Sequence, residues 1–129
     1  MSRVMCLVVI LLLTTGAIAP APAIAQSLTT VQAAFDAWTP GETETMKGRI
    51  RINVLAFGGT VVGRTTKGVK CKGTVTVNIV FSGGNGSMSC TDGRKGTFTY
   101  TLTSSLPPRG TGIGKLNNGK TVMFRIKPK

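Results

Sequence analysis

The chain lacks histidine and has only four acidic residues, which removes most common catalytic arrangements. Without histidine there is no Ser-His or Cys-His pair to activate a nucleophile. Glu42 and Glu44 lie two positions apart, near Asp36, in a threonine-rich segment that we expect to be a solvated linker. A glycosidase acid pair would need a cleft that fixes the two carboxylates, and no spacing singles out a Ser-Lys dyad. We therefore expect neither an enzyme nor a cofactor.

Cysteine is scarce as well, with three in the chain. Cys6 falls in the N-terminal apolar run described below and is expected to be removed with it. Cys71 and Cys90 are then the remaining cysteines. In an oxidising compartment these two should form a disulfide, which would contribute roughly 3 kcal/mol. Two thiols without histidine cannot complete a tetrahedral zinc site, so no metal is expected.

Long apolar runs are missing except at the N-terminus. Arg3 provides a positive start, Val4 to Leu13 are almost all apolar, and Ala23-Ile24-Ala25 place small residues at −3 and −1. This pattern predicts a signal peptide over residues 1–25, cleavage before Gln26, and a periplasmic or secreted protein. The run is too short to span a bilayer; a retained membrane anchor is the alternative interpretation.

Charge is strongly one-sided. The chain carries 16 Lys and Arg and a net charge of +12, and loss of Arg3 with the signal peptide would leave +11. Such a field attracts polyanions, including anionic lipid, lipopolysaccharide, acidic glycan and nucleic acid. The alternative is that the charge serves solubility alone.

Residues 27–38 have a helical spacing of apolar side chains. Leu28, Val31, Ala34, Phe35 and Trp38 fall on one face, and Pro40-Gly41 follows as a stop signal. The sequence therefore predicts an N-terminal helix and linker over 26–45. A β domain should follow over 46–129.

From Met46 onward the apolar pattern has a period of two, typical of half-buried strands. It recurs in KGRIRINV (47–54), KCKGTVTVNIVF (70–81), GTFTYTL (96–102) and KTVMFRIK (120–127). Short strands with threonine-rich outer faces and glycine-rich connections indicate a small antiparallel barrel or sandwich of six or seven strands.

Two segments, 84–100 and 110–126, repeat at a spacing of 26 residues and suggest a duplicated β-hairpin. For the inward residues of both strands in a hairpin to share one face, the loop between the strands must have an odd number of residues. Three-residue loops, 91–93 and 117–119, each ending in glycine, meet this condition. That register places Gly86 opposite Phe98 and Gly112 opposite Phe124, so each ring covers a strand glycine.

The disulfide does not follow so simply. If residues 69–81 paired with 86–91 in a direct hairpin, Cys90 would face about residue 77, roughly 20 Å from Cys71. Either the strand bends sharply near Gly73 or the bond crosses between sheet layers. The sequence leaves both options open.

The stretch GKLNNGKT (114–121) fits the phosphate-binding pattern G-x-x-x-x-G-K-[ST]. A working P-loop needs a strand before it and a helix after it, whose N-terminus faces the phosphates. Here Gly119 falls at a predicted hairpin turn, and the following residues alternate like a strand. We expect a β-hairpin with surface lysines Lys115 and Lys120.

The spacing G-x-G-x-x-x-x-x-[DN]-G in GNGSMSCTDG (84–93) and GTGIGKLNNG (110–119) resembles the core of MORN-type repeats. The resemblance implies β-hairpins that stack into a curved sheet, in a family of scaffolds proposed to contact lipids or proteins. Gly96 and Val122 stand where that repeat carries an aromatic residue, so only hairpin geometry is implied. The chain is also similar in kind to small exported bacterial β proteins.

The leading hypothesis is an exported, non-enzymatic binding domain whose basic face contacts an anionic envelope component, with nucleic acid a weaker candidate. Strand alternation selects the basic residues opposite the apolar ones; they are Lys47, Arg49, Arg51, Lys70, Lys72, Arg125 and Lys127. One alternative is a protein-interaction or assembly module. Another is an inhibitor of an exported enzyme that presents the loop SSLPPRG (104–110).

Overall fold

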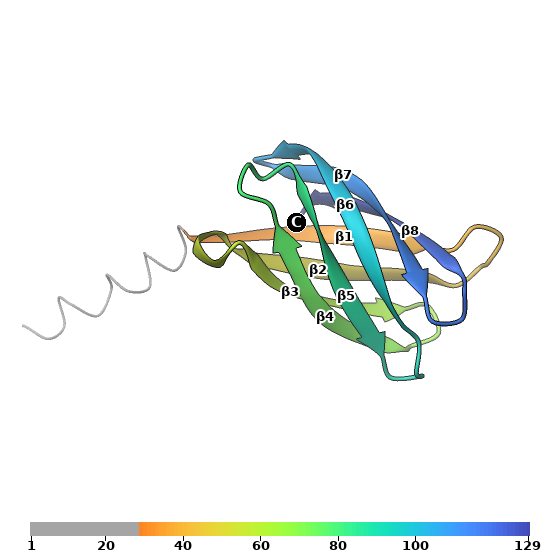
Figure 1. Ribbon diagram of the computed structural model, residues 1–129. Helices are drawn as coiled ribbons and strands as arrows, with labels where there is room; N and C mark the ends of the chain where they lie inside the picture. Colours follow the sequence, from red (N-terminus) through yellow and green to blue (C-terminus); the bar gives the residue numbers. More distant parts are fainter. Residues whose placement is uncertain (1–28) are drawn as a thin grey trace, which may run out of the picture. The chain divides into compact units, whose positions relative to one another are not determined.

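The computed structural model describes residues 29–129, and Val31–Lys129 make one compact unit. This unit is a closed barrel of eight antiparallel strands joined in sequence order (Figure 1). β8 pairs with β1, with Phe35 opposite Ile126, and this pairing closes the barrel. The strands are β1 (Thr30–Trp38), β2 (Thr45–Asn53), β3 (Gly58–Thr65), β4 (Lys70–Val77), β5 (Gly83–Cys90), β6 (Lys95–Ser105), β7 (Pro108–Leu116) and β8 (Thr121–Pro128).

The predicted N-terminal helix is wrong, because residues 30–38 form β1. The segment also has a period of two: Ala33, Phe35 and Ala37 are buried inside the barrel while the residues between them are not. Alanine fits both periodicities, so the local pattern is ambiguous. Pairing with β8 selects the strand conformation. Without β1, the edges of β2 and β8 would have unpaired backbone N–H and C=O groups.

The predicted barrel is confirmed over the sandwich, but the strand number was too low. The segment Gly58–Thr65 was not recognised as a strand and forms β3 between β2 and β4. A three-residue 3-10 turn, Val54–Ala56, connects β2 to β3. Gly58, Gly59 and Gly63 interrupt the apolar alternation of this segment, which explains the omission.

The two C-terminal hairpins have the predicted register. Gly86 lies opposite Phe98 and Gly112 opposite Phe124. A Cβ atom built on Gly112 would lie 2.2 Å from the Phe124 ring, so this ring occupies the space that glycine leaves. The rings of Phe98 and Phe124 meet edge to face inside the barrel, with centroids 5.4 Å apart.

The disulfide forms through a simpler geometry than either option considered. Cys71 and Cys90 are direct cross-strand partners on β4 and β5, with Cα atoms 4.0 Å apart. The error lay in extending the strand to Phe81. β4 ends at Val77, and residues 78–82 form the connection, so the register shifts by six positions and brings the cysteines together.

The barrel interior is apolar but not tightly filled. No side chain among the described residues is fully buried, since even Ala37 and Val75 keep 3 % of their surface exposed. Many inward positions carry glycine, which contributes no side-chain volume, and small residues such as Ala33 add little. An eight-stranded barrel is just wide enough to be filled by side chains or to hold one small ligand. In this barrel the side chains do not fill the interior, so space for a small ligand remains.

Candidate functional site

The structure assembles a basic patch on the outer surface of β2, β3 and β4. Because β3 lies between β2 and β4, the predicted cations of those two strands become near neighbours. Lys47 faces Arg64, which in turn faces Lys70, so three cations stand in one row across the strands. All members of the patch are exposed. We define the basic patch as Lys47, Arg49, Arg51, Arg64, Lys70 and Lys72.

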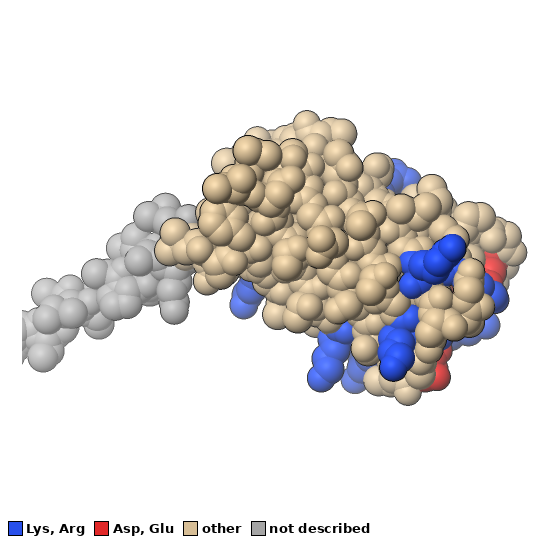
Figure 2. All heavy atoms as spheres, viewed as in Figure 1, with Lys and Arg blue, Asp and Glu red and all other residues tan. Residues whose placement is uncertain are grey.

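None of the six side chains in the basic patch forms an ion pair among the described residues. The four carboxylates of the chain are engaged elsewhere, by Lys120, Lys127 and Arg94. Directly opposed like charges on neighbouring strands destabilise a sheet. Figure 2 shows Lys and Arg along the lower edge of the barrel and at its right-hand end, whereas the upper left is uncharged.

Two predicted members of the basic face do not join the basic patch. Arg125 and Lys127 lie on β8, which is separated from β2 by β1. Lys127 forms an ion pair with Asp36 of β1 at 2.8 Å, and this contact lowers the pKa of Asp36. Arg125 lies over the Trp38 ring at 5.9 Å. The β8 cations therefore have direct partners, whereas in the basic patch Lys47 has only a longer-range attraction to Asp36.

Arg64 was missed from the sequence because its segment was not assigned to a strand. The signal was present: Thr60, Val62 and Arg64 alternate with the buried Val61 and Thr65. A period-two reading of residues 58–65 would have placed Arg64 on the outer face, beside the cations of the neighbouring strands.

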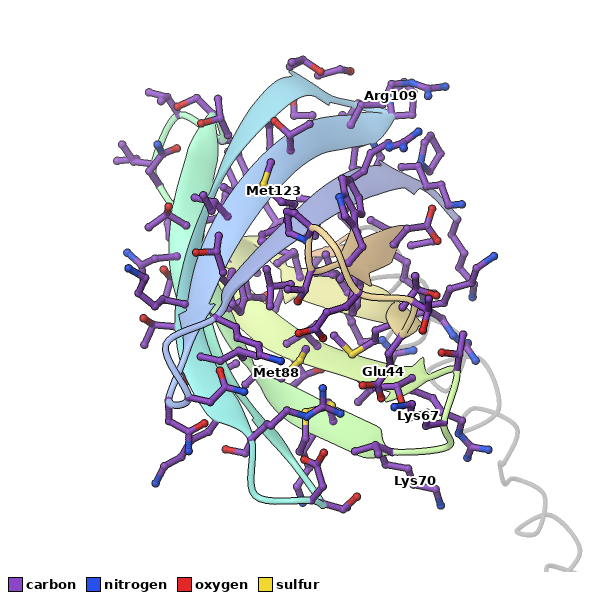
Figure 3. The ribbon with its side chains drawn as sticks, turned by 90° about the vertical axis from the view of Figure 1, so that its right-hand side faces the viewer. Glu44, Lys67, Lys70, Met88, Arg109 and Met123 are labelled. Atoms are coloured by element: carbon purple, nitrogen blue, oxygen red, sulfur yellow. A yellow bond between two sulfur atoms is a disulfide. The ribbon has the colours of Figure 1, made fainter. Side chains whose placement is uncertain are left out.

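The two ends of the barrel differ. We call the end that carries connections 39–44, 66–69, 91–94 and 117–120 the turn end; it is the right-hand end in Figure 1. Figure 3 looks onto this end, with Glu44 beside its mouth. The opposite end carries connections 54–57, 78–82 and 106–107, and we call it the rim end.

A partly buried ion pair crosses the turn end. Arg94 donates to both carboxylate oxygens of Glu44 at 3.1 and 3.0 Å, and its Nε donates to Asp92 at 2.7 Å. Glu44 precedes β2 and Arg94 precedes β6, four strands apart in a ring of eight, so the pair spans the mouth. Hydrogen bonds from Arg94 and then from the Thr65 hydroxyl lower the pKa of Glu44.

The prediction of a solvated linker around Glu44 is therefore wrong. The Glu44 side chain is only 12 % exposed and is held by Arg94. Glu42, in the same connection, is paired with Lys120 and more exposed. Neither carboxylate faces a second acid across a cleft; both serve to join connections that are distant in sequence.

The interior contains an apolar cavity of about 380 Å³. It runs along the barrel, from Glu44 and Arg94 at the turn end to Val80 and Leu106 at the rim end. Met88 lies inside it toward the turn end (Figure 3).

The main polar group within the wall is the Tyr100 hydroxyl, which donates to the Thr76 carbonyl at 2.6 Å. Burial raises the pKa of Tyr100 to about 12. The phenol proton is therefore engaged by the protein, and the oxygen can only accept a further hydrogen bond.

The rim end is apolar and exposed. Phe57 and Phe81, from two neighbouring connections, have ring centroids 5.6 Å apart. Five of the eight exposed large apolar side chains of the described residues lie here; with their exposed fractions they are Leu55 75 %, Phe57 40 %, Ile79 78 %, Val80 73 % and Leu106 80 %. We call these five the apolar rim. The predicted strand over 70–81 would include Ile79 on its apolar face, but β4 ends at Val77 and Ile79 lies beyond it.

The P-loop pattern and the segment SSLPPRG both lie in β-hairpins. The stretch 114–121 runs from β7 through the turn into β8, with no helix after it, so the P-loop geometry is missing. The segment 104–110 is not an extended loop, because β6 reaches Ser105 and β7 begins at Pro108. Only Leu106 and Pro107 connect the two strands.

Over residues 29–129 no group of three or more potential ligands is arranged to hold a metal ion. That part of the chain also contains no helix that is long and apolar enough to cross a membrane. The predicted signal peptide, with Cys6, lies outside the described residues.

The fold and cavity define a class, the closed eight-stranded up-and-down barrel with a hollow apolar interior. Two solved structures are similar in fold. A de novo designed fluorescence-activating β-barrel has a TM-score of 0.59 and 14% identity, and the match covers 81% of this chain and 97% of that one. A redesigned β-barrel, mFAP1, bound to DFHBI, has a TM-score of 0.58 and 15% identity, over 80% and 97% of the two chains.

No family model matches the chain, and no curated protein sequence does so either. The resemblance of residues 84–93 and 110–119 to MORN-type repeats therefore stays an expectation. In this structure the two hairpins are adjacent parts of one closed barrel.

Proposed function

We propose that the chain is an exported, non-enzymatic binding domain that contacts an anionic envelope component, an anionic lipid or lipopolysaccharide surface, through the basic patch. The observation that carries the proposal is the row Lys47, Arg64 and Lys70, which forms no ion pair among the described residues and is continued by the other cations of β2 and β4. Such a row costs stability in the free protein, roughly 0.2–1 kcal/mol for each directly opposed pair. A bound phosphate-bearing surface would relieve this repulsion.

Export is supported by the leader-like N-terminal sequence and by the Cys71–Cys90 disulfide. Disulfides persist in oxidising compartments and are rare in the cytosol. A periplasmic or secreted location also gives the basic patch access to envelope lipids and glycans.

A protein partner is the second candidate, and the apolar rim favours it. Exposed apolar patches mark interaction sites in many proteins. The two candidates differ in salt dependence, because contacts of the apolar rim should persist at high ionic strength while phosphate contacts weaken.

The test is binding of the oxidised protein to vesicles of neutral phosphatidylcholine with and without phosphatidylglycerol, at increasing salt. Lipopolysaccharide, peptidoglycan and duplex DNA are measured in parallel. We expect binding that requires the anionic component and weakens log-linearly with salt. Arg49→Glu/Arg51→Glu should abolish it.

The matched control is Lys95→Glu/Lys115→Glu, which makes the same change in net charge on exposed positions of β6 and β7. We expect this control to retain most of the binding. Equal losses in the two variants would show that net charge alone matters, and unchanged binding in Arg49→Glu/Arg51→Glu would refute the basic patch as the site.

A further inference from the structure

The interior cavity has the features of a binding site that is separate from the basic patch. It is apolar, about 380 Å³ in volume, and extends between the two ends of the barrel. Pockets for small ligands typically have volumes of about 300–1,000 Å³. The cavity is therefore large enough for one small molecule, and its shape follows the strands.

The two ends of the cavity differ, and the difference indicates the end at which a ligand would enter. At the turn end, the Glu44–Arg94 ion pair spans the mouth, and the disulfide side chains lie just beneath it in the cavity wall. At the rim end no ion pair joins the connections among the described residues, and the cavity is lined by Val80 and Leu106, both of the apolar rim. A ligand would enter from the rim end and stop at the turn end.

The interior also restricts the chemistry of its ligand. Among the described residues the single buried side-chain polar atom without a partner is an oxygen of Asp36, which lies on the outer face of β1. The interior Tyr100 hydroxyl, Glu44 and Arg94 are all hydrogen-bonded within the protein. A polar ligand group placed among the apolar side chains between the two ends would lose most of its water partners, at a cost of about 1–3 kcal/mol for each unpaired group. This mainly apolar interior therefore favours hydrocarbon as the inserted portion.

We infer that the barrel binds one unbranched acyl chain, inserted tail first through the apolar rim, with its polar head left in solvent at the rim end. The elongated cavity selects a narrow linear chain, and the flexible side chains of Met46 and Met88 in its wall can adapt to the chain. The apolar rim would receive the chain as it leaves a lipid or micellar phase.

Calorimetric titration of the oxidised protein with saturated fatty acids from octanoic to palmitic acid, each below its micelle concentration, tests this inference. Neutral octanol, decanol and dodecanol are titrated in parallel, so that charge attraction is separated from chain burial. We expect one site per barrel. Affinity should rise up to about fourfold for each added methylene, and then stop rising when the tail reaches the Glu44–Arg94 pair.

Ala37→Leu adds volume inside the cavity near the turn end, while Ala34→Leu makes the same change on an outward-facing position of β1. We expect Ala37→Leu to shorten the longest chain that still gains affinity by one or two methylenes, and Ala34→Leu to leave the series unchanged. Urea unfolding of both variants verifies that they are folded.

A second pair of variants tests the route by changing the rim end of the cavity while leaving its wall toward the turn end intact. Val80→Ser/Leu106→Ser removes exposed apolar rim side chains, and Val62→Ser/Ile113→Ser removes exposed apolar side chains from the barrel wall. We expect the first double variant to slow association with dodecanol several-fold and the second to have no effect. Equal rates in the two double variants would overturn the assignment of the rim as the route.

The inference fails if the folded protein shows no saturable binding to any member of either series, or if affinity does not depend on chain length. Its failure is distinguishable from that of the proposed function. Arg49→Glu/Arg51→Glu should leave decanol binding unchanged, and Ala37→Leu should leave binding to anionic vesicles unchanged.

Discussion

The turn end and the rim end of the barrel are built from the same strands yet have opposite chemistry. The turn end has three acidic residues paired with Arg94 or Lys120, and the Cys71–Cys90 bond lies close below it. The rim end has exposed apolar side chains and no ion pair among the described residues. Contacts that stabilise the fold are thus concentrated at one end.

This difference shows how a hollow barrel can be stable. A cavity removes the contacts that a filled core would supply, so other contacts must hold the strands in place. Here the disulfide joins β4 to β5, and ion pairs join connections at the turn end. The rim end is left free of such contacts, and stabilising it by burying its apolar side chains would close the route to the cavity.

The largest effect is expected from the disulfide. Cys71→Ser/Cys90→Ser should lower the free energy of unfolding by about 3 kcal/mol, because the unfolded chain loses a loop-closing cross-link. Urea unfolding of the wild-type and variant proteins measures the change. A loss below about 1 kcal/mol would mean that the turn end does not depend on this bond.

The next effect is expected from the ion pair that crosses the turn end. Glu44→Gln should lower the free energy of unfolding by about 1–2 kcal/mol, since it leaves Arg94 partly buried without its main partner. Glu42→Gln is the matched control, because its partner Lys120 is 53 % exposed; we expect a change within about 0.5 kcal/mol. Similar losses in the two variants would contradict the role assigned to the Glu44–Arg94 pair.

The same pair predicts a dependence on pH. The pKa of Glu44 is lower in the folded protein than its ordinary value of 4.5, so the stabilisation is complete above pH 4.5. It is lost as the pH falls below 4.5 and through the folded pKa. Urea unfolding of the wild type between neutral and acidic pH should show this loss, and Glu44→Gln should show a shallower one.

A smaller effect is expected at Tyr100, which joins β6 to the carbonyl of Thr76 on β4. Tyr100→Phe should cost about 1 kcal/mol in urea unfolding, because the Thr76 carbonyl loses its donor. Since the chain has one tyrosine, an alkaline absorbance titration reads this phenol alone. We expect a midpoint near 12 in the folded protein, and a stability that declines as the pH rises above 10. A midpoint of 10 in the folded state would contradict its burial.

The smallest effect is expected at the apolar rim. Val80→Ser/Leu106→Ser should change the free energy of unfolding by less than about 0.5 kcal/mol, because both side chains are already exposed in the folded state. A loss of more than 1 kcal/mol would show that the apolar rim stabilises the fold, and the contrast between the two ends would no longer hold.

The alternation of apolar and polar residues from Met46 onward specified most of the strands, and parity within 84–100 and 110–126 specified two registers correctly. These features are local, because a residue's face depends on its position along one strand. The class of fold and the outward direction of the β2, β4 and β8 cations could therefore be predicted. Their function remains a proposal.

Tertiary structure decided the features that depend on strands meeting. Residues 30–38 have both helical and strand periodicity, and only closure against β8 selects the strand. The partnership of Cys71 with Cys90 depends on where β4 ends, and the Glu44–Arg94 pair joins residues 50 positions apart. The basic patch, the cavity and the apolar rim arise because closing eight strands into a ring fixes which residues become neighbours, a relation that no single strand contains.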